Sequence, residues 1–221
     1  MKVNWWWWRK GGLDKAAHPE SYDHGQARLL ELTFSRLLFG IHALPFVGAP
    51  FLLWMWQQGL DVTNMLIWLA VCVLFNLWAV RLKGTFFLDL SALSALRAVD
   101  KWRPAIHRLA IVYGFGVSIL ALITAGKVST GFAYLLLTVQ AAIIAGNATH
   151  LSPEIGTFKR FFTVAWGICV VLIPWSFPDE WPATLFLSLI FVLAIHLQAM
   201  RSHSFFVQFV QLEESSKQLA E

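Results

Sequence analysis

Six long apolar segments constrain the fold of this chain more than any other feature. Each approaches the roughly 20 residues that an α-helix needs to cross the hydrocarbon core of a bilayer. The predicted spans are Leu37–Trp56, Val62–Val80, His107–Ala125, Gly131–Ala148, Phe161–Phe177 and Ala183–Met200. The connections after the first, third and fifth spans are very short, so these spans pair with their successors as antiparallel hairpins. The sequence therefore predicts an all-α membrane protein with six transmembrane helices.

The composition agrees with a membrane protein and excludes several other classes. Apolar residues make up 57% of the chain and charged residues only 14%, whereas a soluble domain carries about a quarter charged residues. The net charge of +4 does not indicate nucleic-acid binding, because the basic residues lie between apolar segments rather than in one patch. Cys72 and Cys169 both fall within apolar segments, and we expect both thiols to be buried and inert.

The distribution of basic residues predicts the orientation in the membrane. With the N-terminus in the cytoplasm, every Lys and Arg except Lys127 falls on the cytoplasmic side, while Asp61, Asp179 and Glu180 fall on the opposite side. Cytoplasmic loops carry the excess of Lys and Arg in membrane proteins. We therefore expect a multi-pass membrane protein with both termini in the cytoplasm. Aromatic belts are expected at the outer interface (Trp54, Trp56, Trp175, Trp181) and at the inner one (Trp78, Trp102).

Residues 1–36 are predicted to form a cytoplasmic, basic and Trp-rich segment. The cluster Trp5–Trp8 is too short for a signal peptide and suits an interfacial anchor; the alternative is an irregular N-terminus whose Trp side chains contact a neighbouring helix. Ser21–Arg36 is expected to be a helix that leads into the first span. A second cytoplasmic segment, Phe86–Arg103, has the pattern of an amphipathic helix lying on the membrane.

The six spans form a predicted membrane domain of residues 37–200, and residues 201–221 continue the last span. Neither Gly nor Pro occurs between Met200 and Glu221. Apolar residues recur there with heptad spacing, with Ser216 in the remaining position: Phe205, Phe209, Leu212 and Leu219. This spacing predicts a cytoplasmic coiled-coil helix through which the chain forms a parallel homodimer. The alternative is an incidental amphipathic helix.

The chain has no pattern typical of a catalytic or metal site. It lacks a nucleotide-binding glycine loop, a Cys pair at metal spacing and the HExxH motif, so no catalytic residue and no metal ligand is predicted. Polar side chains within membrane spans are costly, and each is a candidate for function. The candidates are His42, Asn76, Gln140, Asn147, His150 and His196. All but Gln140 lie in the cytoplasmic halves of their spans and are predicted to converge on one pocket for a small or lipophilic ligand. The alternative is that each forms interhelical hydrogen bonds that hold the helices together.

Two other functional classes stay open. His42 and His196 are the one pair that would suit a bis-histidine haem, although no cofactor is otherwise expected. A small transporter is the other alternative. Neither an inverted repeat nor an acidic residue at membrane depth supports it.

Two stretches carry a resemblance to a known family. One is Gln140–Pro153 followed by Phe158 and Phe161, and the other is the polar helix 205–221. Together they resemble the six-helix membrane sensory modules, including the MASE type, that precede histidine kinase or diguanylate cyclase (GGDEF) domains in bacterial signalling proteins. The resemblance implies a sensory and dimerisation domain in the bacterial inner (plasma) membrane. It also implies that an output domain follows Glu221 and that any enzymatic activity lies in that output domain. It implies no particular ligand.

Overall fold

The computed structural model describes residues 19–220, with side chains from 23 to 213 and at 215 and 216. Within this range the chain folds into six helices: α2 (Pro19–Gln57), α3 (Thr63–Ala92), α4 (Ala95–Thr124), α5 (Thr130–His150), α6 (Ile155–Ser176) and α7 (Trp181–Ala220). Each helix contains an apolar stretch long enough to cross a membrane. The predicted all-α architecture, with six helices long and apolar enough to span a membrane, is therefore confirmed for the described residues. The cluster Trp5–Trp8 lies outside the described residues.

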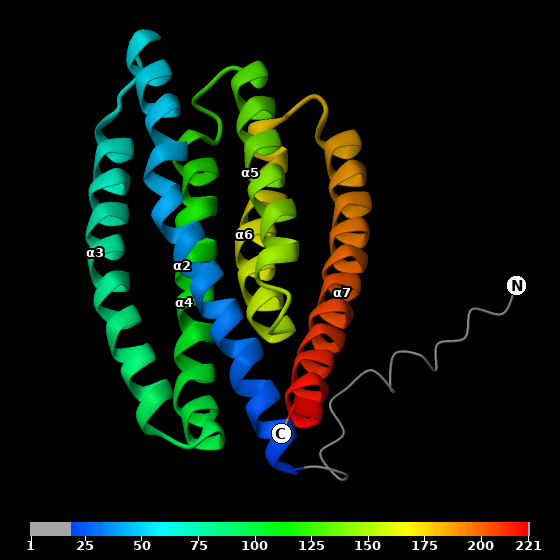
Figure 1. The fold of residues 1–221 in the computed structure, drawn as a ribbon. Helices are drawn as coiled ribbons and strands as arrows, with labels where there is room; N and C mark the ends of the chain where they lie inside the picture. Colours follow the sequence, from blue (N-terminus) through cyan, green and yellow to red (C-terminus); the bar gives the residue numbers. More distant parts are fainter. Residues whose placement is uncertain (1–18, 221) are drawn as a thin grey trace, which may run out of the picture.

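The helices form an up-and-down bundle of antiparallel neighbours (Figure 1). The turns at 58–62, 125–129 and 177–180 lie at one end of the bundle, and those at 93–94 and 151–154 lie at the other. In Figure 1, α3 and α7 form the two edges, and α2 and α5 lie in front of α4 and α6. Because the number of helices is even, the first residues of α2 and the last residues of α7 lie at the same end, which we call the terminal end.

The centre of the bundle is the contact between α4 and α6, the most extensive helix pair. Small residues allow the two backbones to approach, since a Cβ atom at Gly114 would lie 2.8 Å from the carbonyl oxygen of Phe161. Ala110 and Ala165 are both fully buried beside it. Tyr113 stacks on the Phe161 ring with 4.8 Å between ring centroids. This close packing fixes the positions of α4 and α6, around which the other helices are arranged.

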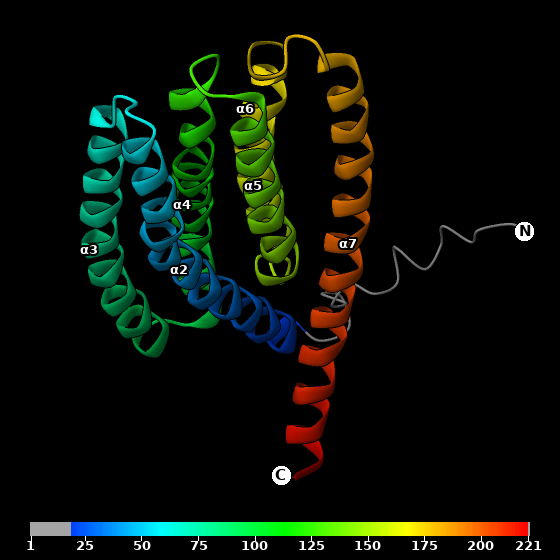
Figure 2. The same ribbon diagram turned by 90° about the horizontal axis from the view of Figure 1, so that it is seen from above.

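Two helices extend well beyond the length of a membrane span. The predicted helix over Ser21–Arg36 is confirmed as the first part of α2, which continues without a break through Pro45 and Pro50. The last span also continues, as predicted, in the single 40-residue helix α7. Figure 2 shows its final turns projecting beyond the other helices at the terminal end. A continuous helix links the membrane region to residue 220 without a hinge in the backbone.

The prediction for Phe86–Arg103 was wrong. This segment is not one surface helix: α3 ends at Ala92 and α4 begins at Ala95, so the segment forms the tip of a hairpin. Phe86 packs against protein, because its ring lies 4.4 Å from that of Phe34 and 5.2 Å from that of Trp102, whereas Leu88 and Leu96 are exposed. The same contacts correct the placement of Trp102. This residue is buried, and its indole N–H donates to Asp89 Oδ2 at 2.9 Å.

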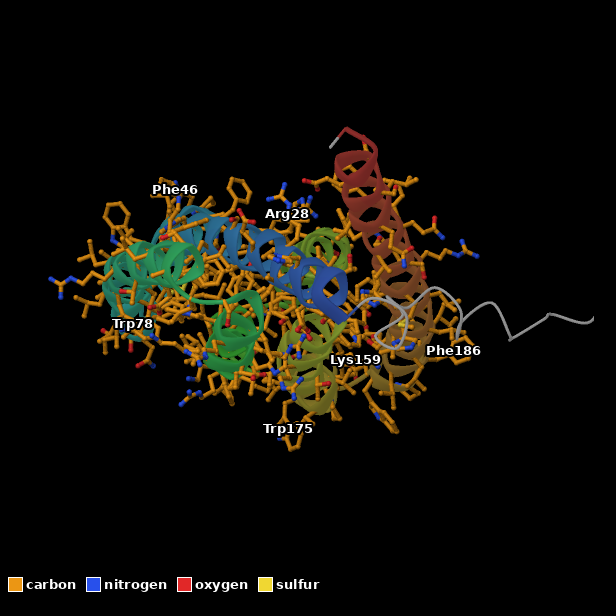
Figure 3. The ribbon with its side chains drawn as sticks, turned by 60° about the horizontal axis from the view of Figure 1, so that its bottom comes forward. Arg28, Phe46, Trp78, Lys159, Trp175 and Phe186 are labelled. Carbon is orange, nitrogen blue, oxygen red and sulfur yellow. The ribbon has the colours of Figure 1, made fainter. Side chains whose placement is uncertain are left out.

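The outer surface is apolar over most of the bundle. Large side chains point outward in Figure 3, including Phe46, Trp78, Trp175 and Phe186. Trp56 and Trp181 are exposed as well, whereas Trp54, also predicted for the outer belt, is half-buried and packs against Phe132. Arg28 and Lys159, also labelled in Figure 3, belong to the basic terminal end. Lipid is the natural solvent for such a surface.

Candidate functional site

The structure divides the predicted polar residues among several places instead of one pocket. His42 and Asn76 form the first pair, in which the imidazole Nδ1 is hydrogen-bonded to the Asn76 side-chain oxygen across the α2–α3 contact. The Asn76 amide nitrogen also donates to the Ile41 carbonyl at 3.1 Å and to the Cys72 carbonyl at 2.8 Å. The contacts of His42 and Ile41 with Asn76 link α2 to α3, in agreement with the structural alternative for these residues.

Gln140 and Asn147 make separate contacts on α5. The Gln140 amide donates to the Val117 carbonyl at 3.1 Å, and its oxygen accepts from the Cys169 thiol at 3.2 Å. Asn147 donates to the Tyr113 hydroxyl oxygen at 3.2 Å and to the Ile143 carbonyl at 2.8 Å. Both side chains are buried. They tie α5 to the central α4–α6 pair.

His150 and His196 are exposed on different helices. His150 ends α5 and lines a cavity next to α2, while His196 lies on α7, at the edge of the bundle. His42 belongs to the opposite side, where α2 meets α3. A search of the described residues for three or more His, Cys, Asp or Glu side chains able to hold a metal ion found no such group.

The most distinctive hollow in the membrane region is a groove between α2 and α5. Its inner part has a volume of about 140 Å³, with Gly40, Ala43 and Val47 from α2 facing Ala142 and Gly146 from α5. Tyr113 and Asn147 form its buried floor. Phe39 and His150 also line a second hollow of about 430 Å³ at the terminal end, together with Ser35, Arg36, Thr149 and Phe206. The two hollows share Phe39 and His150 as lining residues, and we call them together the α2–α5 groove.

A second site, at Glu154, was not among the predicted residues. Glu154 caps the start of α6, where its Oε2 accepts from the backbone N–H and the hydroxyl of Thr157, both at 2.6 Å. The same oxygen lies 2.9 Å from Nε2 of His107 on α4. Burial raises the pKa of Glu154, but the hydrogen bonds from Thr157 and His107 outweigh it and hold the pKa below its usual range. The carboxylate is therefore ionised at neutral pH.

The turn that contains Glu154 joins four helices. The backbone N–H of Glu154 donates to the hydroxyl of Thr33 on α2 at 2.9 Å. On α7, Nδ1 of His203 lies 2.9 Å from the carbonyl oxygen of Ser152. A Ser-Pro pair ahead of an apolar helix is a typical helix-start signal, and Ser152-Pro153 stands just before the capping residue Glu154. That signal indicates the cap but not its partners, because His107 and Thr33 are far away in the sequence.

The last part of α7, after Met200, has one buried face and one exposed face. Phe206, Val207 and Val210 are buried against Leu29 of α2. On the other face, Phe205, Phe209 and Leu212 have exposed fractions of 62%, 47% and 69%. Leu219, the last residue of the predicted heptad pattern, has a side chain outside the described set. The three described members of the pattern thus form an uncovered apolar stripe, which we call the α7 stripe.

Comparison with known proteins gives no family for this chain. A scan against protein-family models, a search of curated proteins and a search of solved structures each found no match.

Proposed function

We propose that this chain is the transmembrane sensory and dimerisation domain of a bacterial signal-transduction protein. In this proposal a stimulus in the membrane region shifts α7 relative to α2, and α7 carries the change to an output domain beyond residue 221. The output domain would be a histidine kinase or a diguanylate cyclase, as the family resemblance implies. A two-state device of this kind needs two arrangements within a few kcal/mol and a stimulus that favours one of them.

One observation carries the proposal: the exposed apolar α7 stripe on a helix that continues without interruption from the membrane region. Among polar terminal residues, Phe205, Phe209 and Leu212 recur with intervals of four and three. A row with this spacing buries itself when a second parallel helix packs against it. A second copy of the chain supplies the matching row, which supports a homodimer with α7 at its axis.

The contacts between α7 and α2 support the coupling step. The Arg36 guanidinium lies over the Phe206 ring at 4.4 Å, and Arg28 forms an ion pair with Glu213 at 3.6 Å. His203 reaches the turn at 152–153, which Glu154 joins to α4. A displacement of α2, α4 or α5 is therefore transmitted to α7 through direct contacts.

The orientation belongs to the proposal as well. Lys and Arg are concentrated at the terminal end. This end includes the first halves of α2 and α4, the start of α6 and the final part of α7. Lys127 is the exception, in a turn at the other end. By the positive-inside tendency the terminal end faces the cytoplasm, where an output domain can meet its nucleotide substrate.

The assembly can be tested by crosslinking through single cysteines in native membranes. Cys72 and Cys169 are first replaced by Ala, and one Cys is then introduced at Phe209, at Leu212 or, as a control, at Val207. We expect dimers through positions 209 and 212 and none through 207, because Val207 is buried against α2. Failure to crosslink at both stripe positions would refute the proposed dimer.

The signalling role needs its own measurement. The chain is fused through residue 221 to a diguanylate cyclase output domain, and cyclic dinucleotide production is followed in cells. Leu212→Ala should change the output severalfold by loosening the α7 pair, whereas Leu193→Ala, an exposed position higher on the same helix, should not. Equal effects of the two substitutions would contradict transmission through the α7 stripe.

A further inference from the structure

The shape of the α2–α5 groove matches an alkyl chain. Its two walls are apolar and contain small residues, Gly40 and Ala43 on α2 and Ala142 and Gly146 on α5. A Cβ atom at Gly146 would have no heavy atom within 4 Å, so this wall borders open space rather than protein. Phe39, Ala142 and Gly146 are exposed. The groove is therefore accessible from the side, where acyl chains surround the protein.

The terminal end of the groove carries positive charge. Arg36 lines it, and no described carboxylate forms an ion pair with this guanidinium, whose charged group contacts the Phe206 ring instead. His150, Ser35 and Thr149 line the same hollow. A guanidinium with its neighbouring hydroxyl and imidazole groups suits an anionic oxygen ligand such as a phosphate.

The floor of the groove has polar groups one helical turn deeper. Tyr113 is only 2% exposed, yet it lines the groove. Its hydroxyl oxygen accepts from Asn147 at 3.2 Å, and the hydroxyl hydrogen has no acceptor among the described residues. Asn147 precedes His150 by three positions, which is about 4.5 Å along the helix. A buried donor at this depth suits an ester carbonyl just below a headgroup.

We propose that the α2–α5 groove binds one anionic phospholipid from the leaflet that contains Arg36. The phosphate lies against Arg36 and His150, a glycerol ester carbonyl accepts from Tyr113, and one acyl chain fills the groove between Gly40 and Gly146. Basic hollows between transmembrane helices at the cytoplasmic side are typical sites for acidic lipid headgroups. The groove thus offers a charged site for the headgroup and, next to it, an apolar site for an acyl chain, in the same order as in a lipid leaflet.

The site also connects with α7, because Phe206 forms part of the headgroup hollow and contacts Arg36. A bound phosphate would compete with the Phe206 ring for the guanidinium. Binding itself does not depend on the proposed signalling role, and it is measured without any output domain.

Native mass spectrometry of the full chain can test the site. The protein is purified in a mild detergent and titrated with phosphatidylglycerol, phosphatidylcholine or palmitic acid. The informative variants are Gly146→Leu, whose side chain enters the groove, and Arg36→Gln, which removes the charge. The matched controls are Gly131→Leu, at the other end of α5 with equally open space around its Cβ position, and Arg81→Gln, an exposed arginine on α3.

Wild-type protein should retain one phosphatidylglycerol in preference to phosphatidylcholine. Gly146→Leu should weaken binding by about tenfold, since each methylene group excluded from an apolar site lowers the affinity about fourfold. Arg36→Gln should weaken it about fivefold, as expected for one basic residue at an anionic surface. The two controls should bind like the wild type. Equal retention of both phospholipids, retention of palmitic acid alone, or unchanged binding by Gly146→Leu would each overturn the proposal.

Discussion

The Glu154 carboxylate lies 2.9 Å from Nε2 of His107, and this contact joins the turn before α6 to the middle of the basic part of α4. Arg103, one turn earlier on α4, approaches the other carboxylate oxygen at 3.9 Å. The turn also contacts α2 through Thr33 and α7 through His203. The turn at 152–154 therefore connects α2, α4 and α7 with the start of α6 at the terminal end.

The first prediction concerns the pH dependence of stability. The pKa of Glu154 is lowered in the folded protein, so its stabilising contribution is fully present above the unfolded value of about 4.3 and is lost as the pH falls through the folded value. Wild-type thermal stability in detergent should therefore decrease below about pH 5. Glu154→Gln should lower the free energy of unfolding by about 1–3 kcal/mol at neutral pH. The stability of this variant should also decrease less steeply as the pH falls below about 5. If the variant lost stability at acidic pH as steeply as the wild type, other titrating groups would be responsible for that loss.

The second prediction concerns the α4–α6 contact. Gly114→Ala should destabilise the protein by about 1–3 kcal/mol, because the new Cβ would lie 2.8 Å from a backbone carbonyl that has little freedom to move. Gly167→Ala on α6 is the control. Its Cβ would meet no heavy atom within 4 Å, so the better helix propensity of Ala should stabilise the protein by about 0.5–1 kcal/mol. Unfolding in a denaturing detergent measures both, and equal effects would contradict the close backbone approach.

The sequence was sufficient for the spans but not for their contacts. Apolar segments near bilayer length identified all six helices, since length and hydropathy alone decide whether a helix can span. The segment around Phe86 and Trp102 was misinterpreted because its apolar face suits either lipid or another helix, and only the position of Phe34 distinguishes the two. Likewise, His42 and His196 have similar depths in the sequence pattern, but depth carries no information on which neighbour each residue faces.

The third prediction concerns the pair His42 and Asn76. If the two side chains serve mainly to join α2 to α3, His42→Leu and Asn76→Leu should each cause a modest loss of stability. A double-mutant cycle should give a coupling free energy of about 0.6 kcal/mol, the average for polar contacts between transmembrane helices. The control cycle combines His42→Leu with Gln140→Leu. Gln140 has different partners, so these two effects should add. Absence of coupling in the first cycle would contradict the hydrogen bond between His42 and Asn76.

The last prediction concerns topology, because the two ends of the bundle must face different compartments. Reporter domains fused after Gln58, Val128 and Pro178 follow the turns at one end, and fusions after Ser94 and Pro153 follow the turns at the terminal end. The excess of Lys and Arg at the terminal end predicts a cytoplasmic location for the last two. We therefore expect alkaline phosphatase activity from the first three fusions and fluorescence of a cytoplasmic reporter from the others. A consistent reversal of all five would overturn the orientation but keep the bundle, whereas a single reversed fusion would show that the two helices flanking that turn do not cross the membrane.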